Sequence, residues 1–127
     1  MLTNYVHNVS YLAERSFKLD GSDKYKLQPD GTYNLPVCFL PAGAIVTQVY
    51  LQMNEPCNVT AKVGFNEEIS LFIHEADLNV TAPHTSAVVA KTQKDGAIIL
   101  NVNHAYALGQ GVVYVEYYLP AVIKTEI

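Results

Sequence analysis

The chain contains 127 residues, which is the size of a single domain. Half of the residues are hydrophobic, 16% are charged and the formal net charge is -4. Because phosphate backbones and anionic membranes are bound by clustered Lys and Arg, this composition argues against nucleic acid and a membrane surface as partners. A typical globular chain is about 25% charged, so the low charge predicts that a homo-oligomer or a larger assembly covers part of the surface.

The two ends of the chain carry few strand signals. We expect an N-terminal arm at 1–15, with a possible helical turn at 9–15, and a C-terminal tail at 121–127, on either side of one domain at 16–120. The amino terminus lacks the basic and apolar regions of a signal peptide, and the apolar runs are too short to span a bilayer. We therefore expect a protein that is made in a cytoplasm and does not enter a membrane.

Short alternating segments begin the domain. Apolar and charged residues alternate at 17–19 and again at 25–27, and turn residues follow each segment at 20–23 and 29–31. The next segment, "TYNLPVCF" at 32–39, contains a proline, which removes a backbone donor from the ladder. It is therefore expected to be an edge strand or to contain a bulge.

The longest regular alternation follows a turn at 41–44. Over 45–53 the period of two, with several β-branched residues, predicts a strand with one buried face, and we place the odd-numbered residues toward the core. Further strands are expected at 58–63, 69–73, 87–90, 97–102 and 111–119, with a long loop at 75–86.

These segments predict the fold class. Eight or nine short strands separated by turns, with no intervening helix, are typical of an all-β sandwich or barrel with antiparallel pairing. We expect an antiparallel β-sandwich, jelly-roll-like, with about eight or nine strands and an extended N-terminal arm.

The last strand carries a cluster of tyrosines. If Val113, Val115, Tyr117 and Leu119 face the core, the other face displays Tyr114 and Tyr118 around Glu116. Exposed tyrosines can anchor a protein interface or stack on sugar rings, and alternatively both faces of the strand could be covered. The candidate interface residues are Tyr5 and Tyr11 in the arm, and Tyr114 and Tyr118 in the last strand.

No catalytic motif is present. The sequence "FIHEAD" brings together His74, Glu75 and Asp77, but on a strand His74 and Glu75 point to opposite faces, and only folding could add His84 or His104. The adjacent acids at 67–68 could serve a glycosidase, but they are typical of a polar turn. We expect no enzyme activity, no metal and no cofactor; a small hydrolase or metal-dependent enzyme around "FIHEAD" is the weakest alternative.

The two cysteines, Cys38 and Cys57, could form a disulfide if two strands brought them together. A reducing cytosol argues against the bond. We expect free thiols, with a disulfide as the alternative.

A resemblance adds to this interpretation. The segment "LPAGAIVTQVYLQMNEPCNVTAKVGF" at 40–65, the loop "IHEADLNVTAP" and the final "GVVYVEYYLP" resemble small virion proteins encoded among the structural genes of tailed bacteriophages. The resemblance covers 40–120, about two thirds of the chain, and no catalytic residue can be carried over from it.

This resemblance implies a capsid cement or head decoration protein with a sandwich fold. Such a protein would bind the major capsid protein on the outside of the virion, as a homo-oligomer in which a trimer is favoured. Its affinity would come from many copies and several modest contacts in each copy. The alternative is a tail-associated or fibre-associated module that binds a receptor or a carbohydrate through the same tyrosines.

Overall fold

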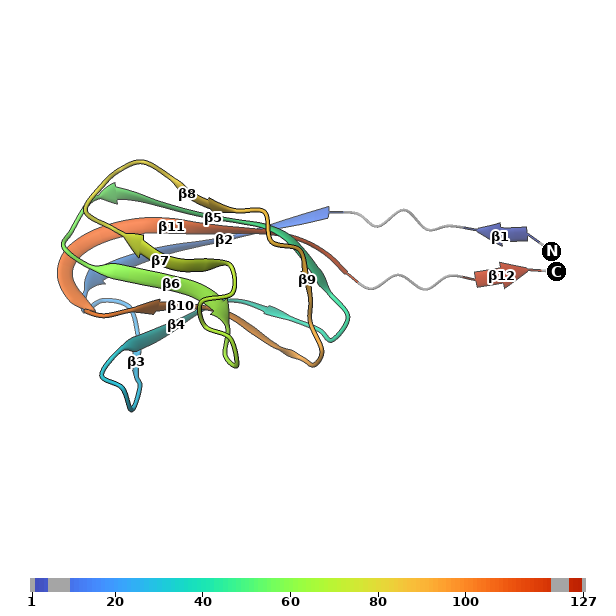
Figure 1. Cartoon of the computed structure of the whole chain (residues 1–127), viewed down its shortest axis with the longest axis horizontal. Helices are drawn as coiled ribbons and strands as arrows, with labels where there is room; N and C mark the ends of the chain where they lie inside the picture. The colour runs from blue at the N-terminus through green and yellow to red at the C-terminus, as the bar shows by residue number, and fades with distance from the viewer. Residues whose placement is uncertain (1, 5–9, 120–123, 127) are drawn as a thin grey trace.

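The computed structural model describes residues 2–4, 10–119 and 124–126. Twelve strands lie in this part of the chain, and ten of them form a sandwich of two antiparallel sheets (Figure 1). The expected all-β antiparallel sandwich is confirmed. The strands are β1 (Leu2–Asn4), β2 (Ser10–Asp20), β3 (Lys26–Leu27), β4 (Tyr33–Leu40), β5 (Ile45–Glu55), β6 (Thr60–Phe65), β7 (Ile73–Asp77), β8 (His84–Ser86), β9 (Ala90–Lys91), β10 (Gly96–Val102), β11 (Tyr106–Tyr118) and β12 (Lys124–Glu126).

Each sheet is built around one central strand. In the first sheet the order is β3-β4-β10-β6-β7, with β10 in the centre. In the second sheet the order is β2-β11-β5-β8, and β9 also pairs with β5. The remaining strands, β1 and β12, pair with each other as a separate ribbon that lies apart from the sandwich (Figure 1). Among the described residues there is no helix long and apolar enough to cross a membrane.

The core fills the space between the two sheets. The inward residues of the central strands, such as Ile98 and Leu100 in β10 and Val113 and Val115 in β11, are fully buried. They alternate with residues on the outer faces, as the period of two in each segment predicts. Most other core residues also come from strands, so the hydrophobic pattern of the sequence largely decides which residues are inside.

A bulge changes the buried face of β5. The sequence pattern placed Ile45 and Thr47 inside, but both are half-buried and Val46 is fully buried instead. The pairing of β5 with β11 shifts between Glu116 and Tyr117, and an extra residue in one strand reverses the alternation beyond it. From Val49 onward the odd-numbered residues face the core as predicted.

The first strand of the sandwich starts before the expected domain boundary. Residues 10–15, assigned to the N-terminal arm and partly to a helical turn, are extended and belong to β2. They pair with 113–118 of β11 along their whole length. The thirteen-residue strand β11 imposes this pairing, because its backbone groups need partners on both sides.

Three other segments differ from the sequence expectation. The expected loop at 75–86 contains the end of β7 and all of β8, whereas the expected strand at 87–90 contributes only its last residue to β9. In place of a strand start at 69, residues 66–71 form a loop that folds back on the first sheet. A Cβ added to Gly64 in β6 would collide with the backbone of Glu68 and Ile69, so the loop lies directly on the outer face of this sheet.

Candidate interaction surfaces

The outer face of the second sheet carries aromatic side chains on two neighbouring strands. Tyr114 and Tyr118 lie on this face of β11, opposite the buried Val113 and Val115, as the sequence predicted. Tyr50 of β5 joins them because it is the register partner of Tyr114. We call Tyr50, Tyr114 and Tyr118 the tyrosine face.

Several contacts hold the tyrosine face in place. The rings of Tyr50 and Tyr114 meet edge to face, with centroids 5.7 Å apart and an interplanar angle of 60°. The Tyr50 hydroxyl donates a 2.6 Å hydrogen bond to Oε1 of Gln52. Thr47 Oγ1 donates to Oε1 of Glu116 over 2.8 Å. Side chains that are already ordered lose less entropy when a partner covers them, which suits a binding surface.

The other two candidate tyrosines do not lie on this face. Tyr11 of β2 is the register partner of Tyr117 in β11, and the two rings stack with centroids 5.6 Å apart. Tyr11 is 44% exposed and Tyr117 packs against the core, where burial raises the pKa of its hydroxyl. Tyr5 lies outside the described residues. The sequence missed Tyr50 and Tyr117 as partners because cross-strand register does not follow from local patterns.

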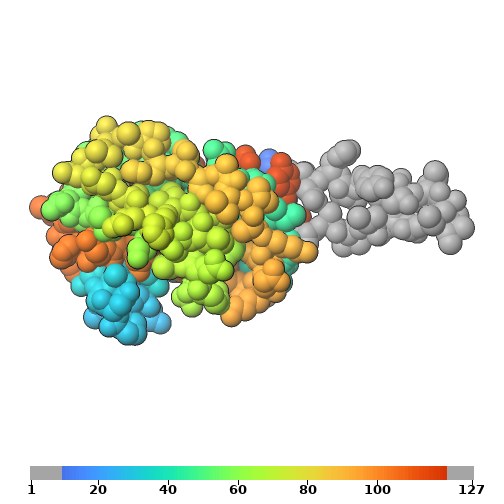
Figure 2. Space-filling view, in the orientation of Figure 1, coloured from blue at the N-terminus to red at the C-terminus, as the bar shows by residue number. Residues whose placement is uncertain are grey.

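A second surface is a pocket at the end of the sandwich where β4 ends and β5 begins. Its volume is about 650 Å³, and its lining comes from two segments, 65–71 and 90–97, with the apolar side chains of Phe65, Leu71, Ala90 and Ala97. Figure 2 shows the lime-coloured segment around 65–70 next to the orange segment around 90–97 that makes the other wall. We call this cavity the end pocket.

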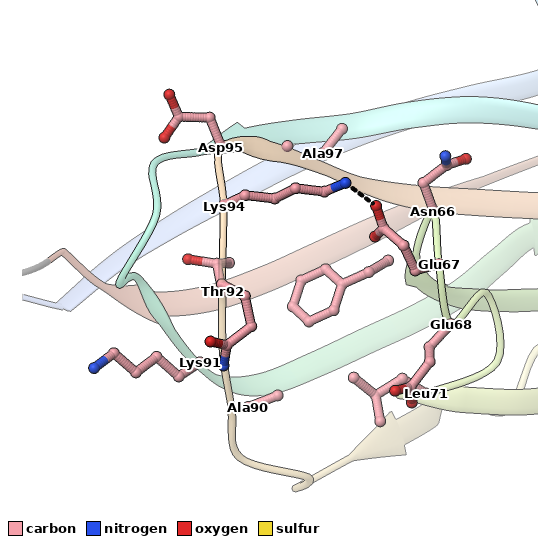
Figure 3. A pocket seen from close by; sticks show the side chains of 13 residues that line it. Asn66, Glu67, Glu68, Leu71, Ala90, Lys91, Thr92, Lys94, Asp95 and Ala97 are labelled. Carbon is pink, nitrogen blue, oxygen red and sulfur yellow. Dashed lines mark ion pairs between the residues drawn. The ribbon is translucent and has the colours of Figure 1, made fainter.

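Charged side chains bridge the mouth of the end pocket. Lys94 extends toward Glu67, and its Nζ lies 2.7 Å from Oε1 of Glu67 (Figure 3). The hydrogen bond from Lys94 holds the pKa of the Glu67 carboxyl below its usual value. Both side chains are largely exposed, so the ion pair contributes little to stability.

Hydrogen bonds fix the wall formed by 91–97. Thr92 Oγ1 donates to the Pro41 carbonyl over 2.6 Å, and the Ala42 amide donates to Oδ1 of Asp95 over 2.8 Å. The wall is thereby attached to the turn between β4 and β5. The pocket is consequently a preformed cavity.

The acidic and histidine candidates do not assemble into a site. His74 and Glu75 are both exposed on β7, where a pairing irregularity with β6 changes the alternation. His84 Nε2 lies 3.0 Å from the backbone oxygen of Asp77. Within the described ranges no group of three or more His, Cys, Asp or Glu side chains is placed to hold a metal ion.

Both cysteines are free thiols. Cys38 on β4 is partly buried, and desolvation raises the pKa of its thiol to about 11. Cys57 is buried against Gly109, and a Cβ added to Gly109 would collide with Sγ of Cys57. Neither thiol is poised for nucleophilic chemistry, because the reactive form is the thiolate.

Solved structures similar to this chain come from bacteriophage capsids. One is a chain of the "Acidic stable capsid structure of Helicobacter pylori bacteriophage KHP30", with a TM-score of 0.72 and 27% identity over 99% of this chain and 100% of that chain. Another is a chain of the "Cyanophage Pam1 capsid asymmetric unit", with a TM-score of 0.60 and 24% identity over 94% of each chain. A scan against family models and a search of curated proteins found no match.

The first neighbour supports a bacteriophage structural protein that is related to capsid components and located in the virion. The first likeness extends over almost the whole chain, so it is not confined to a common sandwich core. The second likeness, at lower identity, concerns the fold alone.

Proposed function

We propose that the protein is a non-enzymatic capsid cement, or decoration, protein of a tailed bacteriophage. It binds the major capsid protein on the outer surface of the virion as a homotrimer, after synthesis in the host cytoplasm, and needs no cofactor. The observation that carries the proposal is the likeness over nearly the full length of both chains to a chain of a phage capsid structure.

The tyrosine face is the proposed contact with the shell. It offers preordered aromatic area with hydrogen-bonding groups of Gln52 and Glu116 beside it. Tyrosine combines a large apolar ring with a polar tip and is enriched in protein interfaces. Modest contacts suffice, because many copies act together on one shell. Tyr11 and Tyr5 are proposed as additional contacts near the amino terminus.

Binding to shells tests this proposal. Purified protein is mixed with empty capsids, assembled from the major capsid protein of the encoding phage, and the bound fraction is measured by sedimentation. The double variant Tyr114→Ala, Tyr118→Ala is expected to bind at least about tenfold more weakly, because truncation of a hot-spot tyrosine costs about 2 kcal/mol or more and about 1.4 kcal/mol corresponds to a factor of ten. Tyr106→Ala, which removes a 73% exposed tyrosine at the start of β11, is the matched control.

Two results would contradict the proposal. The unchanged protein could fail to sediment with the shells, or the double variant could bind them as well as the control. Because tyrosines beside amide and carboxylate groups also suit sugar rings, a glycan array is run in parallel. Retention of a glycan by the unchanged protein, lost in the double variant, would favour the receptor-binding or carbohydrate-binding alternative.

A further inference from the structure

Two buried asparagines lie side by side on the outer face of the first sheet. Asn34 of β4 and Asn101 of β10 are direct register partners, and they are only 9% and 7% exposed. Asparagine is depleted in β-strands, where β-branched and aromatic residues pack better. Departures from such local preferences are expected at functional sites, so this pair is a candidate for one.

The asparagine pair lies in a polar pocket of about 310 Å³. The turn at 28–32, which projects from the sheet between β3 and β4, forms one side of the pocket, and the loop after β6 forms the other (Figure 1). Sites for small molecules measure about 300–1,000 Å³, so this cavity suits a ligand of about one ring. We call it the amide pocket, and its polar lining residues are Gln28, Asp30, Thr32, Asn34, Asn66 and Asn101.

Hydrogen bonds fix both sides of the amide pocket. The Gln28 amide donates to the Thr32 carbonyl over 2.7 Å, and the Gly31 amide donates to the Gln28 carbonyl over 3.0 Å. Gly31 has a φ of 87°, a conformation that favours glycine. Thr32 Oγ1 donates to Oδ1 of Asp30 over 2.6 Å. On the other side the loop lies against Gly64, so the pocket is formed before a ligand binds.

The asparagine pair retains unused hydrogen-bonding capacity. Nδ2 of Asn101 donates to Oδ1 of Asn34 over 2.7 Å and to Oγ1 of Thr32 over 2.8 Å. These bonds use both N–H groups of Asn101, but no protein group in the described ranges bonds to its Oδ1 or to Nδ2 of Asn34. Neither atom is sealed inside the described protein, where the enclosed atoms without a partner are Arg15 Nε and the Tyr25 hydroxyl. One acceptor and one donor therefore remain for a ligand in the pocket.

The free groups around the pair are mainly acceptors. Gln28 donates through Nε2 to the Lys26 carbonyl, which leaves its Oε1 free. The hydrogen bonds from Thr32 hold the pKa of the Asp30 carboxyl below its usual value, and they engage only Oδ1. Asp30 is therefore a carboxylate near neutral pH with a second oxygen to spare. An acceptor-rich pocket with this charge disfavours an anionic ligand.

A bare metal ion is also a poor match. Ca²⁺ takes six to eight oxygen ligands, among which carboxylates are usual, and Asp30 is the only carboxylate that lines the pocket. Lys62 of β6 is the register partner of Asn101, so it lies on the same face of the sheet beside the pair. Its positive charge adds to the lowering of the Asp30 pKa by Thr32. The same charge opposes a cation at this place.

A sugar matches the free groups, because each hydroxyl both donates and accepts. Neighbouring hydroxyls of one ring can donate to Oδ1 of Asn101 and accept from Nδ2 of Asn34. Pro29 and Ile69, on opposite sides of the pocket, supply apolar contact for the C–H groups of the ring. We propose that the amide pocket binds a neutral pyranose sugar, either free or as a residue of a glycan. This activity goes beyond the proposed function and does not depend on it.

Titration of the ¹⁵N-labelled protein tests the proposal. Glucose, galactose, mannose and N-acetylglucosamine are added one at a time, and proton–nitrogen correlation spectra are recorded. At least one sugar should give saturable shifts of the side-chain amide signals of Asn34 and Asn101, and of backbone amides at 28–32 and 66–69. We expect a dissociation constant in the millimolar range, since one ring offers only about twelve heavy atoms. No saturable shift with any of these sugars, or saturable shifts confined to other segments, overturns the proposal.

Variants assign the binding to the pocket. Asn66 is exposed, and no described protein group bonds to its side chain, so Asn66→Ala should fold normally and weaken binding by about threefold to tenfold. Asn101→Ala should weaken it by at least about tenfold, and thermal unfolding checks its fold. The matched control is Asn58→Ala, which changes an exposed asparagine outside the pocket. If Asn66→Ala binds the sugar as well as the control does, the proposal fails even where Asn101→Ala does not fold.

Further measurements separate this site from its alternatives. Calcium chloride that shifts the same signals, when none of the sugars does, would overturn the sugar site in favour of a cation site. On a glycan array, retention that survives Tyr114→Ala, Tyr118→Ala but falls in Asn66→Ala supports the amide pocket and a glycan as the source of the sugar. Shifts with a free sugar and no retention on the array support the pocket and a free sugar. Sedimentation with capsid shells, which tests the proposed function, should be the same for Asn66→Ala and the unchanged protein, so either proposal can fail without the other.

Discussion

The central strands of the two sheets differ in what covers their outer faces. In β10 the inward Leu100 is fully buried, and the outward Ile99 and Asn101 are each only 7% exposed. In β11 the inward Val113 is fully buried, but the outward Tyr114 is only half-buried. The chain thus covers the outer face of the first sheet at its central strand β10 and leaves the outer face of the second sheet partly open at β11.

The difference arises from the loop at 66–71. This loop folds back from the end of β6 and lies on Gly64, which is the register partner of Ile99 in β10. Under the loop, Asn101 donates hydrogen bonds to Asn34 and Thr32, so the N–H groups of its buried amide are satisfied. The comparison teaches that the outer face of the first sheet is buried by the chain itself at β10, whereas the outer face of the second sheet stays partly exposed at β11.

The largest expected effect on stability comes from β10, which is covered on both faces. Leu100→Ala should lower the free energy of unfolding by about 2–5 kcal/mol, because it removes a fully buried side chain and leaves a cavity. Urea unfolding followed by circular dichroism measures the change. Val112→Ala on the outer face of β11 is the comparison variant, and an equal loss there would mean that the outer face of β11 is covered as well.

A smaller loss of stability is expected when the loop at 66–71 is displaced from Gly64. Gly64→Ala places a Cβ against the backbone of Glu68 and Ile69, which cannot move as a side-chain end can. We expect a destabilisation of about 1–3 kcal/mol, as for other overpacked sites. Gly96→Ala is the control, since a Cβ there meets nothing within 4 Å. Equal stability of the two variants would show that the loop does not rest on Gly64.

The interaction between two tyrosines on the outer face of the second sheet should contribute less to stability than either of these changes. A double-mutant cycle with Tyr50→Ala and Tyr114→Ala is expected to give a coupling energy of about 0.5–1 kcal/mol, typical of an edge-to-face aromatic pair across strands. Chemical denaturation of the four proteins measures it. A coupling indistinguishable from zero would mean that the tyrosine face is not preordered before binding.

The smallest effect concerns the ion pair at the edge of the covering loop. The hydrogen bond from Lys94 lowers the folded-state pKa of Glu67 below the usual 4.5, so its contribution is present above that pH and is lost as the pH falls through the folded-state pKa. Glu67→Gln should therefore be marginally less stable than the unchanged protein near pH 7. Thermal unfolding at several pH values should show the difference vanish in acid; a difference that persists there would contradict the ion pair as its cause.

Local patterns determined much of this fold. The alternation at 17–19 and 111–119 separated the two faces of both strands correctly, because a period of two assigns side chains to faces without knowledge of the partner strand. The same reasoning identified Tyr114 and Tyr118 as outward residues. The resemblance to virion proteins agrees with the likeness to phage capsid structures.

Only the tertiary structure decided the rest, because it depends on contacts between distant segments. The bulge that buries Val46, the pairing of Tyr50 with Tyr114 and the extension of β2 to Ser10 all follow from register with β11, which no local pattern encodes. The end pocket joins 65–71 to 90–97, and the two asparagines of the amide pocket are neighbours only because β4 pairs with β10. The sequence by itself determined which face of most strands is apolar, whereas long-range pairing decided which parts of the outer faces the chain covers and which stay exposed.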